Sequence, residues 1–521
     1  MSQVRDDRLD AELLRLIGVT LLGGIMGILD STMVTVAADT LADEFRTTLS
    51  AVSWASTGYL LALTVTIPIT GWAVGRFGVK RLWLFGLVLF LAGSLASALA
   101  WNLGSLVAFR VVQGVGAGVV DPLVLVILAR AAGASRAGRV MGMMGVVLSL
   151  GPVLGPVLGG VVLESLGWRS MFAINLPIGI VAVLLALRVI PAGAPAGKKS
   201  AARFDLLGAV LVAPGFAAIV LALTQAGEHA GLGAPSVLIP LTGGIVLLIG
   251  YVLHALRVRR REPLIDVRLF SSRSFAASVT VQGLVGLATF AGLFALPLYY
   301  QVLHGHGARA AGLLVAPLGL GSALTMPIAG RLSDRLGPRS LVRGGALLAA
   351  FGAVALTRIG PDRSEVWSAL AVFAIGVGLG GAGAPTMGSL YRTLPPEKVA
   401  QGSSVVYNLN QLGGALGVAC VALILAVTGT ATGTGTAADF GSGIGGFQVV
   451  YGFVFAVALV IVAAAPLLPG RPDAPGDAPD DASAGDESGR TPAGERRGER
   501  GGCVALSVLA DKSSTHRLGA T

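Results

Sequence analysis

The most constraining feature of this sequence is a series of long apolar windows that recurs from residue 16 to residue 468. A helix of about 18–25 residues spans the ~30 Å of hydrocarbon in a bilayer. The chain of 521 residues is 54% hydrophobic and 13% charged, a balance typical of polytopic membrane proteins. We therefore predict an all-α membrane protein with about fourteen transmembrane helices. The windows are 16–36, 53–73, 82–101, 105–129, 140–163, 171–188, 206–225, 236–256, 276–300, 311–330, 341–359, 367–390, 403–427 and 447–468.

The basic residues are concentrated in alternate loops between these windows. The net charge of +10 would by itself be compatible with a nucleic-acid-binding protein, but this alternation is the positive-inside bias of membrane proteins. It predicts a multi-pass protein of the cell membrane with both termini in the cytosol, no nucleic-acid partner, and basic loops available to anionic lipid. The basic loops contain Arg76, Lys80 and Arg81; Arg130, Arg136 and Arg139; Lys198, Lys199 and Arg203; residues 257–273; Arg331, Arg335, Arg339 and Arg343; and Arg392 and Lys398.

A glycine-rich basic loop motif occurs twice, as GWAVGRFGVKR at 71–81 and GRLSDRLGPRS at 330–340. Gly71, Arg76, Gly78 and Lys80 of the first copy correspond to Gly330, Arg335, Gly337 and Arg339 of the second, which also contains Asp334. An internal repeat of this kind is expected when two helical bundles rock about a central site.

The repeat and the window positions together predict the domain organisation. Two inserted helices separate two six-helix bundles, and the last residues lack apolar periodicity, which indicates a disordered cytosolic tail. The predicted parts are a cytosolic N-terminus at 1–15, an N-terminal bundle at 16–199, the inserted helices at 200–260, a C-terminal bundle at 261–468 and the tail at 469–521.

Asp30, Arg110 and Asp121 lie well inside predicted spans, where an ionisable group is costly and indicates function. Asp30 is expected ~9 Å and Arg110 ~8 Å from the outer ends of their helices, so Asp30 is the obvious partner for Arg110. Gln113 lies one turn from Arg110, and Asp121 lies on nearly the same face, ~16 Å deeper. We assign Asp30, Arg110 and Asp121 to proton coupling. The alternatives are an interfacial cap for Asp30, a structural ion pair, and a helix-breaking role for Asp121 before Pro122.

The run GPVLGPVLGG at 151–160 places glycine and proline inside an apolar span. Backbone groups in a bilayer must satisfy their own hydrogen bonds, so this segment is expected to stay helical with support from its neighbours. Its glycines recur every four residues and let another helix approach closely. The run is either a tight packing seam or a seam that also shapes a moving part. Its members are Gly151, Pro152, Gly155, Pro156, Gly159 and Gly160.

A second group of polar side chains lies in or at the ends of predicted spans and could line a substrate cavity. Tyr299 could equally belong to an interfacial aromatic belt, and the amides of the thirteenth span could instead join helices. The candidate cavity residues are Gln113, Tyr299, Asn408, Asn410 and Gln411.

Several function classes find no support in the sequence. There is no GxxxxGK[ST] string for ATP hydrolysis and no His/Cys cluster typical of a metal site. No combination of nucleophile and base at one membrane face indicates a membrane-embedded enzyme. We therefore expect a non-enzymatic protein without cofactor or metal.

The chain resembles the fourteen-span drug:proton antiporters of the major facilitator superfamily, the EmrB/QacA type. The matching strings are LDSTMVTVA, GWAVGRFGVKR, RVVQGVGAG, GPVLGPVLGG, GWRSMFAINLPIG, FDLLG, EPLIDVRLF, LPLYYQVLHG and NLNQLGGALG, so the resemblance covers nearly everything except the last fifty or so residues. It implies a proton-driven exporter in which Asp30 and Arg110 match positions tied to proton coupling and 151–160 matches the antiporter motif. The sequence departs from the family at Gly75, where an acid is common, at Asn410, where many relatives have arginine, and at Asp121, which the family does not predict.

We therefore predict a major facilitator fold whose bundles alternate around a midplane cavity. The predicted function is proton-coupled efflux of bulky, partly apolar drugs or antibiotics by a monomer, with the proton gradient as energy source. The alternatives are a dedicated exporter of a single metabolite, antibiotic, peptide or lipid, and a membrane sensor that transports nothing.

Overall fold

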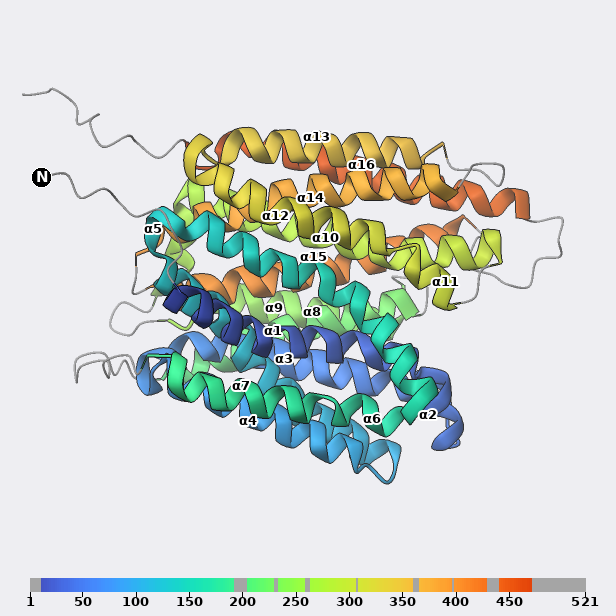
Figure 1. The fold of residues 1–521 in the computed structure, drawn as a ribbon, viewed down its shortest axis with the longest axis horizontal. Coiled ribbons are helices and arrows are strands. Elements are labelled where there is room, and N and C mark those ends of the chain that lie inside the picture. The colour runs from blue at the N-terminus through green and yellow to red at the C-terminus, as the bar shows by residue number, and fades with distance from the viewer. Residues whose placement is uncertain are drawn as a thin grey trace, which may run out of the picture. The chain divides into compact units, whose positions relative to one another are not determined.

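The computed structural model describes residues 11–191, 204–228, 233–257, 263–305, 308–358, 365–395, 398–428 and 440–470. All regular elements in these ranges are helices (Figure 1). The predicted tail beyond residue 470 and the first ten residues lie outside the described residues.

The first half of the chain forms five long helices, with two short helices between them. The long helices are α1 (Ala11–Val36), α3 (Leu49–Phe77), α4 (Val79–Ala98), α5 (Leu103–Leu166) and α7 (Asn175–Val189), and the short ones are α2 (Ala38–Glu44) and α6 (Trp168–Ala173). The helix α5 accounts for two predicted spans. Its backbone leaves the helical conformation at Gly133, where φ is 65°, and a second limb then continues to Leu166.

The second half forms six long helices with one short helix. The long helices are α10 (Arg273–His304), α12 (Ala316–Leu336), α13 (Pro338–Leu356), α14 (Glu365–Thr393), α15 (Val399–Val427) and α16 (Phe440–Ala464), and the short one is α11 (Ala308–Leu313). Single 3₁₀ turns at Val267–Ser271 and Ala465–Leu467 flank this half.

Thirteen helices among the described residues are long and apolar enough to cross a membrane. Each predicted window overlaps a helix, and the window 140–163 falls on the second limb of α5, which contains the shorter apolar segment Leu154–Leu166. The prediction of an all-α membrane protein is thus confirmed.

The two copies of the loop motif adopt the same backbone conformation. Gly78 ends α3 and precedes α4 with φ 80°, and Gly337 ends α12 and precedes α13 with φ 81°. L-residues other than glycine rarely adopt such a positive φ. The repeat seen in the sequence is therefore also a structural repeat.

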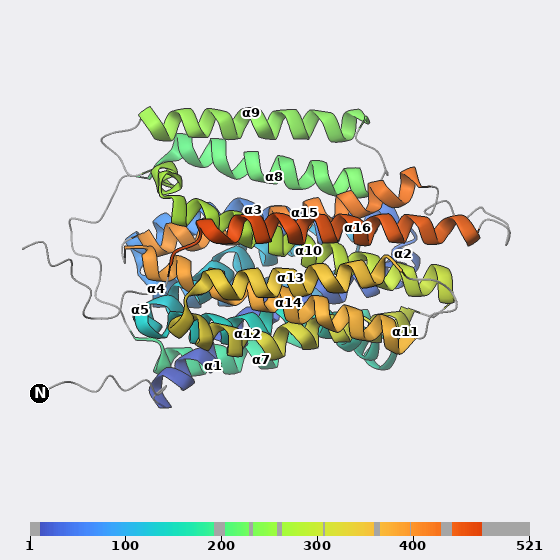
Figure 2. The same cartoon turned by 90° about the horizontal axis from the view of Figure 1, so that it is seen from above.

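The inserted helices are α8 (Leu206–Glu228) and α9 (Pro235–Arg257). Figure 2 shows α8 beside α3 and α15, with α9 on its outer side. Since α3 and α15 belong to different halves of the chain, α8 covers one seam between the halves. The domain boundaries at 200 and 261 stay a prediction, because the described residues between 11 and 470 form one compact unit.

The glycine and proline run of the second limb of α5 is helical, as expected, and its glycine face packs against α1. A Cβ atom on Gly151 would collide with Ile28, and one on Gly155 would collide with Thr32. At Gly159 the nearest atom would be Met33 Cα at 3.2 Å. Gly160 has no such neighbour within 4 Å. Pro156 is half-buried in this limb, and Pro152 lies among the residues whose side chains are not described.

Candidate functional site

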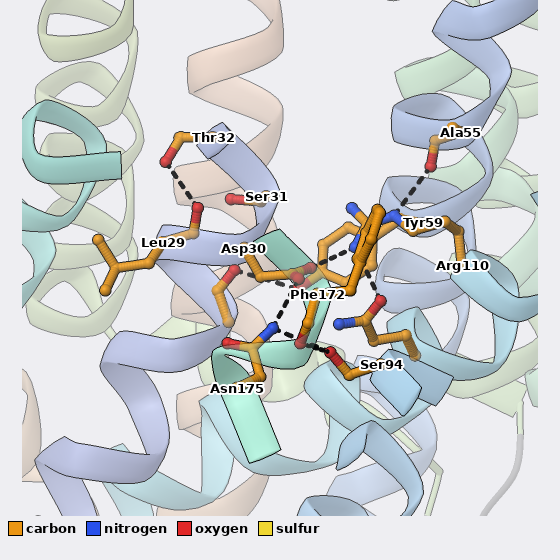
Figure 3. A network of polar contacts seen from close by, with 12 residues as sticks. Leu29, Asp30, Ser31, Thr32, Ala55, Tyr59, Ser94, Arg110, Phe172 and Asn175 are labelled. Atoms are coloured by element: carbon orange, nitrogen blue, oxygen red, sulfur yellow. Dashed lines mark hydrogen bonds and ion pairs between the residues drawn. The ribbon is translucent and has the colours of Figure 1, made fainter. Parts of the chain in front are cut away.

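The centre of the first half holds a buried ion pair. Arg110 of α5 and Asp30 of α1 have side-chain exposures of 0% and 1%. Arg110 Nη1 donates to Asp30 Oδ2, and Asn175 Nδ2 donates to Asp30 Oδ1 at 2.9 Å (Figure 3). The expected pairing of Asp30 with Arg110 is confirmed. The interfacial-cap alternative for Asp30 is wrong, because Asp30 is buried within α1.

The guanidinium of Arg110 is held by four further groups. Its Nε donates to Ala55 O at 3.2 Å, and its Nη1 donates to Gln113 Oε1 at 2.9 Å. Its central carbon lies 4.2 Å from the Tyr59 ring centroid and 5.7 Å from that of Phe172. Charged groups in such a dry site are stable only with partners of this kind.

Sequence reasoning missed Asn175 and Ser94, which orient the carboxylate of Asp30. Asn175 also donates to Ser94 Oγ at 3.0 Å, and Ser94 in turn donates to Phe172 O at 2.8 Å. The available signal was the single amide in the apolar string FAINLPIG, where a buried polar side chain needs partners.

A cavity of about 230 Å³ lies between the two halves. Its walls come from α1, α3 and α5 on one side and from α10, α12, α14 and α15 on the other. Asp121 of α5 lines this cavity and accepts a hydrogen bond of 2.6 Å from the Tyr407 hydroxyl of α15. Asp121, which we predicted to lie deep in its span, is thus part of the cavity wall.

Tyr59 lies between the ion pair and the cavity. Its ring is under the Arg110 guanidinium, while its hydroxyl donates to Gly27 O at 3.2 Å. Tyr59, Gly27 and Asp121 all line the cavity. A residue of the second predicted span therefore contacts both sites, and nothing in the periodicity of that span distinguished it.

The predicted cavity residues separate into three groups. Asn410 and Gln411 line the cavity. Gln113 is bound to Arg110 instead, and Asn408 is buried with no hydrogen-bond partner for its amide among the described residues. Tyr299 lies elsewhere, in the core of the second half, where its hydroxyl and His304 Nε2 are 2.9 Å apart and its ring packs on Phe447.

The halves also contact each other at one end of the helix bundle, which we call the basic end. It is the end where α3, α12 and α14 finish and α5 turns at Gly133. Asp334 of α12 accepts hydrogen bonds from the backbone N–H groups of Gly138 and Arg139 on α5, at 3.0 and 3.1 Å. Arg392 Nη1 of α14 donates to the same carboxylate at 2.6 Å. We call these four residues the Asp334 network.

The first copy of the loop motif makes a different contact. Gly75 stands at the position of Asp334, so the carboxylate is missing from this copy. Gly71 instead lies against Gln401 and Ser404 of α15, and Ser404 donates to Ile67 O at 3.1 Å. Lys80 donates to Leu187 O at 2.7 Å, whereas Arg76 and Arg335 are exposed.

A separate groove of about 740 Å³ lies where α1, α5 and α12 meet near the basic end. Its wall is mostly apolar and includes Leu21, Met143 and Pro327. Arg139 and Arg331 add positive charge to it.

Comparison with known proteins decides the family. The sequence profile described as the Major Facilitator Superfamily matches residues 20–418. The chain belongs to the major facilitator superfamily. This superfamily consists of membrane transporters and not of enzymes, so the predictions on fold and on enzymatic activity are confirmed.

Similar members of the superfamily come from several bacteria. The chain is 38% identical to the Multidrug resistance protein B homolog of Mycobacterium tuberculosis over 80% of this chain and 77% of that protein. It is 30% identical to the Lincomycin resistance protein LmrB of Listeria innocua over 82% and 89%. It is 32% identical to the Riboflavin transporter RibZ of Clostridioides difficile over 76% and 85%.

Solved structures of the superfamily share the fold. The human organic anion transporter MFSD10 superposes with a TM-score of 0.59 at 15% identity, covering 87% of this chain and all of that one. The proton:xylose symporter XylE superposes with a TM-score of 0.56 at 15% identity, covering 87% and 96%. At this identity the likeness concerns the fold alone.

Proposed function

We propose that this transporter exports bulky, partly apolar drugs or antibiotics across the cytoplasmic membrane in exchange for protons. The observation that carries the proposal is the buried Asp30–Arg110 pair, which contacts the cavity between the halves through Tyr59. The names of the Mycobacterium and Listeria relatives support drug export.

Protonation of Asp30 would change the forces on the rest of the pair. The neutral carboxyl no longer attracts Arg110, whose remaining partners are Gln113, the Ala55 carbonyl and the two rings. A buried cation left with neutral partners is unstable and favours a different arrangement of α1 and α5. Because Tyr59 contacts Arg110 and also lines the cavity, this rearrangement reaches the substrate.

Alternation of the two halves between inward-open and outward-open forms would open and close the basic end. We place this end and both termini in the cytosol on the positive-inside bias. Drug enters from the cytosol or the inner leaflet and favours proton loss, and protonation from outside favours drug release. The transporter works as a monomer without a cofactor, and the proton gradient is its energy source.

Dye export tests this function directly. We expect inverted vesicles containing the protein to transport a fluorescent cationic dye only when a proton gradient is present. Asp30→Asn should abolish the gradient-dependent transport while the protein remains in the membrane. Glu44→Gln is the matched control, because Glu44 is a half-exposed acid paired with Arg169 at the opposite end of the bundle. Normal gradient-driven export by Asp30→Asn would remove Asp30 from the mechanism.

A dedicated exporter of one compound is the second candidate. The similarity to a protein named as a riboflavin transporter favours it, because a member with a single named substrate is about as similar to this chain as the lincomycin resistance protein. Screening chemically diverse dyes and antibiotics separates the two candidates. Transport of several unrelated compounds supports multidrug export, and transport of one supports the dedicated exporter.

A further inference from the structure

The described lining of the cavity between the halves contains one carboxylic acid, which does not belong to the buried ion pair. Among the residues that line the cavity, Asp121 is the only one with a charged side chain. Asp30 and Arg110 are absent from the lining and neutralise each other. The two intramembrane acids therefore occupy chemically different places, one paired with a cation and the other facing the space that holds substrate.

We propose that Asp121 binds the positively charged nitrogen of an organic cation in this cavity. This assignment rests on the proposed transport function and identifies the chemical class of its substrate. The ligand is a monocation whose charged nitrogen is flanked by apolar or aromatic groups. The Asp30–Arg110 pair takes no part in recognising that charge.

The polar atoms of the cavity favour a cation over an anion. Besides Asp121, Gln282 lines the cavity, and its buried side-chain oxygen has no hydrogen-bond partner among the described residues. Both groups accept hydrogen bonds or attract positive charge. None of the described residues that line the cavity is a lysine, arginine or histidine, so an anionic ligand would meet the Asp121 carboxylate without a compensating cation from them.

The walls around Asp121 fit the remainder of such a ligand. The Asp121 carboxylate has Gly27 on one side, where a Cβ atom would lie 3.2 Å from Oδ1. Tyr59, Tyr407 and Phe290 also line the cavity. Aromatic rings beside a carboxylate attract an organic cation through their negative faces, and burial strengthens this attraction.

Binding of a cation would act on the contact between the halves. The Tyr407 hydroxyl belongs to the second half and donates to Asp121 Oδ2 of the first half at 2.6 Å. A cation at the carboxylate competes with this hydrogen bond, so occupancy weakens a link across the cavity. Tyr407 is thus a positioning residue that holds the carboxylate when the cavity is empty.

A pair of probes that differ in charge tests the assignment. We would measure binding of 4-(4-dimethylaminostyryl)pyridine and of its N-methylpyridinium salt to the purified full-length protein by dye fluorescence, at a pH where the pyridine is neutral. The same two dyes would be tested for gradient-driven uptake into inverted vesicles, which corresponds to export from the cell. The variants are Asp121→Asn, the charge-conserving Asp121→Glu and Tyr407→Phe, with Asp30→Asn for comparison.

We expect Asp121→Asn to weaken binding of the cation by about thirtyfold or more, since it removes one member of a buried charge pair. Binding of the neutral dye should change by no more than about twofold, or about 0.4 kcal/mol, because a neutral ligand has no charge–charge attraction to lose when Asp121 is replaced by asparagine. Asp121→Glu should restore part of the cation affinity. Tyr407→Phe should retain cation binding, because it leaves the carboxylate in place, and Asp30→Asn should retain the charge preference.

The outcomes separate this assignment from the transport function. Equal losses for the two dyes in Asp121→Asn, an unchanged cation affinity, or no binding of either dye to the wild type would overturn the assignment. Charge-selective binding that depends on Asp121, without export by the wild type, would support the assignment and contradict the proposed efflux.

Discussion

Asp30 and Arg110 are both almost fully buried, and each satisfies the other's charge. Removing one member of a buried pair leaves an uncompensated charge in a medium of low polarity. Removing both charges together avoids this cost. Stability and function therefore respond differently to single and double changes at these positions.

We predict that Arg110→Gln lowers the stability by about 3–5 kcal/mol, because it leaves Asp30 buried without its cation. The double variant Asp30→Asn/Arg110→Gln should recover most of this loss and still fail in proton-driven export. Thermal unfolding of the purified variants in detergent gives the stability order. A double variant that is less stable than Arg110→Gln would show that the pair contributes more than mutual neutralisation.

At the level of helices, the glycine face of the second limb of α5 allows close contact with α1. The face lies against Ile28, Thr32 and Met33, which belong to the same helix as Asp30. In lipid, helices associate through close packing of small residues and not through the hydrophobic effect. The position of Asp30 consequently depends on a contact that only glycine permits.

We predict opposite results for Gly155→Ala and Gly160→Ala, although the chemical change is identical. The added methyl group collides with Thr32 at position 155, and overpacking of this kind costs about 1–3 kcal/mol. At position 160 it meets open space, and alanine is up to about 1 kcal/mol more favourable than glycine in a helix. The thermal unfolding temperature and the rate of dye export should both fall for Gly155→Ala, and neither should fall for Gly160→Ala. Equal behaviour of the two variants would contradict the packing seam.

For the whole molecule, the two halves meet along two seams at the basic end. The Asp334 network closes one of them through α5, α12 and α14. At the other seam, Gly71 of α3 lies against α15. Alternation between the halves requires both contacts to separate in every cycle.

A disulfide across the second seam should arrest the cycle. A Cβ atom on Gly71 would lie 3.6 Å from Gln401 Cα and 3.7 Å from Gln401 Cγ. The Cβ atom of residue 401, which is bonded to both, is therefore close enough for a disulfide, whose Cβ atoms are ~3.5–4.5 Å apart. We predict that oxidation of Gly71→Cys/Gln401→Cys, in a background with Cys420→Ala and Cys503→Ser, abolishes dye export and that a reductant restores it. Each single cysteine variant under the same oxidant is the control. Undiminished export by the cross-linked protein would show that this seam stays closed during transport.

Weakening the Asp334 network should have the converse effect. Asp334→Asn removes the charge that holds Arg392 and is a poorer acceptor for the two backbone N–H groups, since charged hydrogen bonds are about twice as strong as neutral ones. We expect slower formation of the same disulfide, because the basic end opens more often. Arg335→Gln, a change at the exposed neighbour, should leave the rate unchanged. A rate unaffected by Asp334→Asn would mean that the network does not control opening.

Much of this arrangement could be predicted from local sequence. The spans could be located from the length of the apolar windows, because the thickness of the bilayer sets the length of a spanning helix. The pairing of Asp30 with Arg110 could be predicted because an unpaired charge inside the membrane is costly. The loop repeat that includes Gly78 and Gly337 was visible in the sequence, because a turn with positive φ favours glycine in both copies.

The contacts between halves could not be predicted in this way. The partner of Asp121 is Tyr407, 286 positions away, and no helical period reports which face of α15 meets α5. Tyr299 was assigned to the cavity for its polarity, yet it packs in the core of the second half. The same limit applies to Gly138 and Arg139, which bind Asp334 through their backbone N–H groups, a contact that the pattern of side chains does not indicate.

The inserted helices make the two flanks of the transporter unequal. On one flank, a compound dissolved in the lipid meets α9 and then α8 before it can reach the seam between α3 and α15 (Figure 2). On the flank formed by α1, α5 and α12, it meets a mostly apolar groove whose lining includes Arg139 and Arg331. The pseudo-symmetry of the two halves is thus broken in the plane of the membrane, and the two flanks present different surfaces to the surrounding lipid.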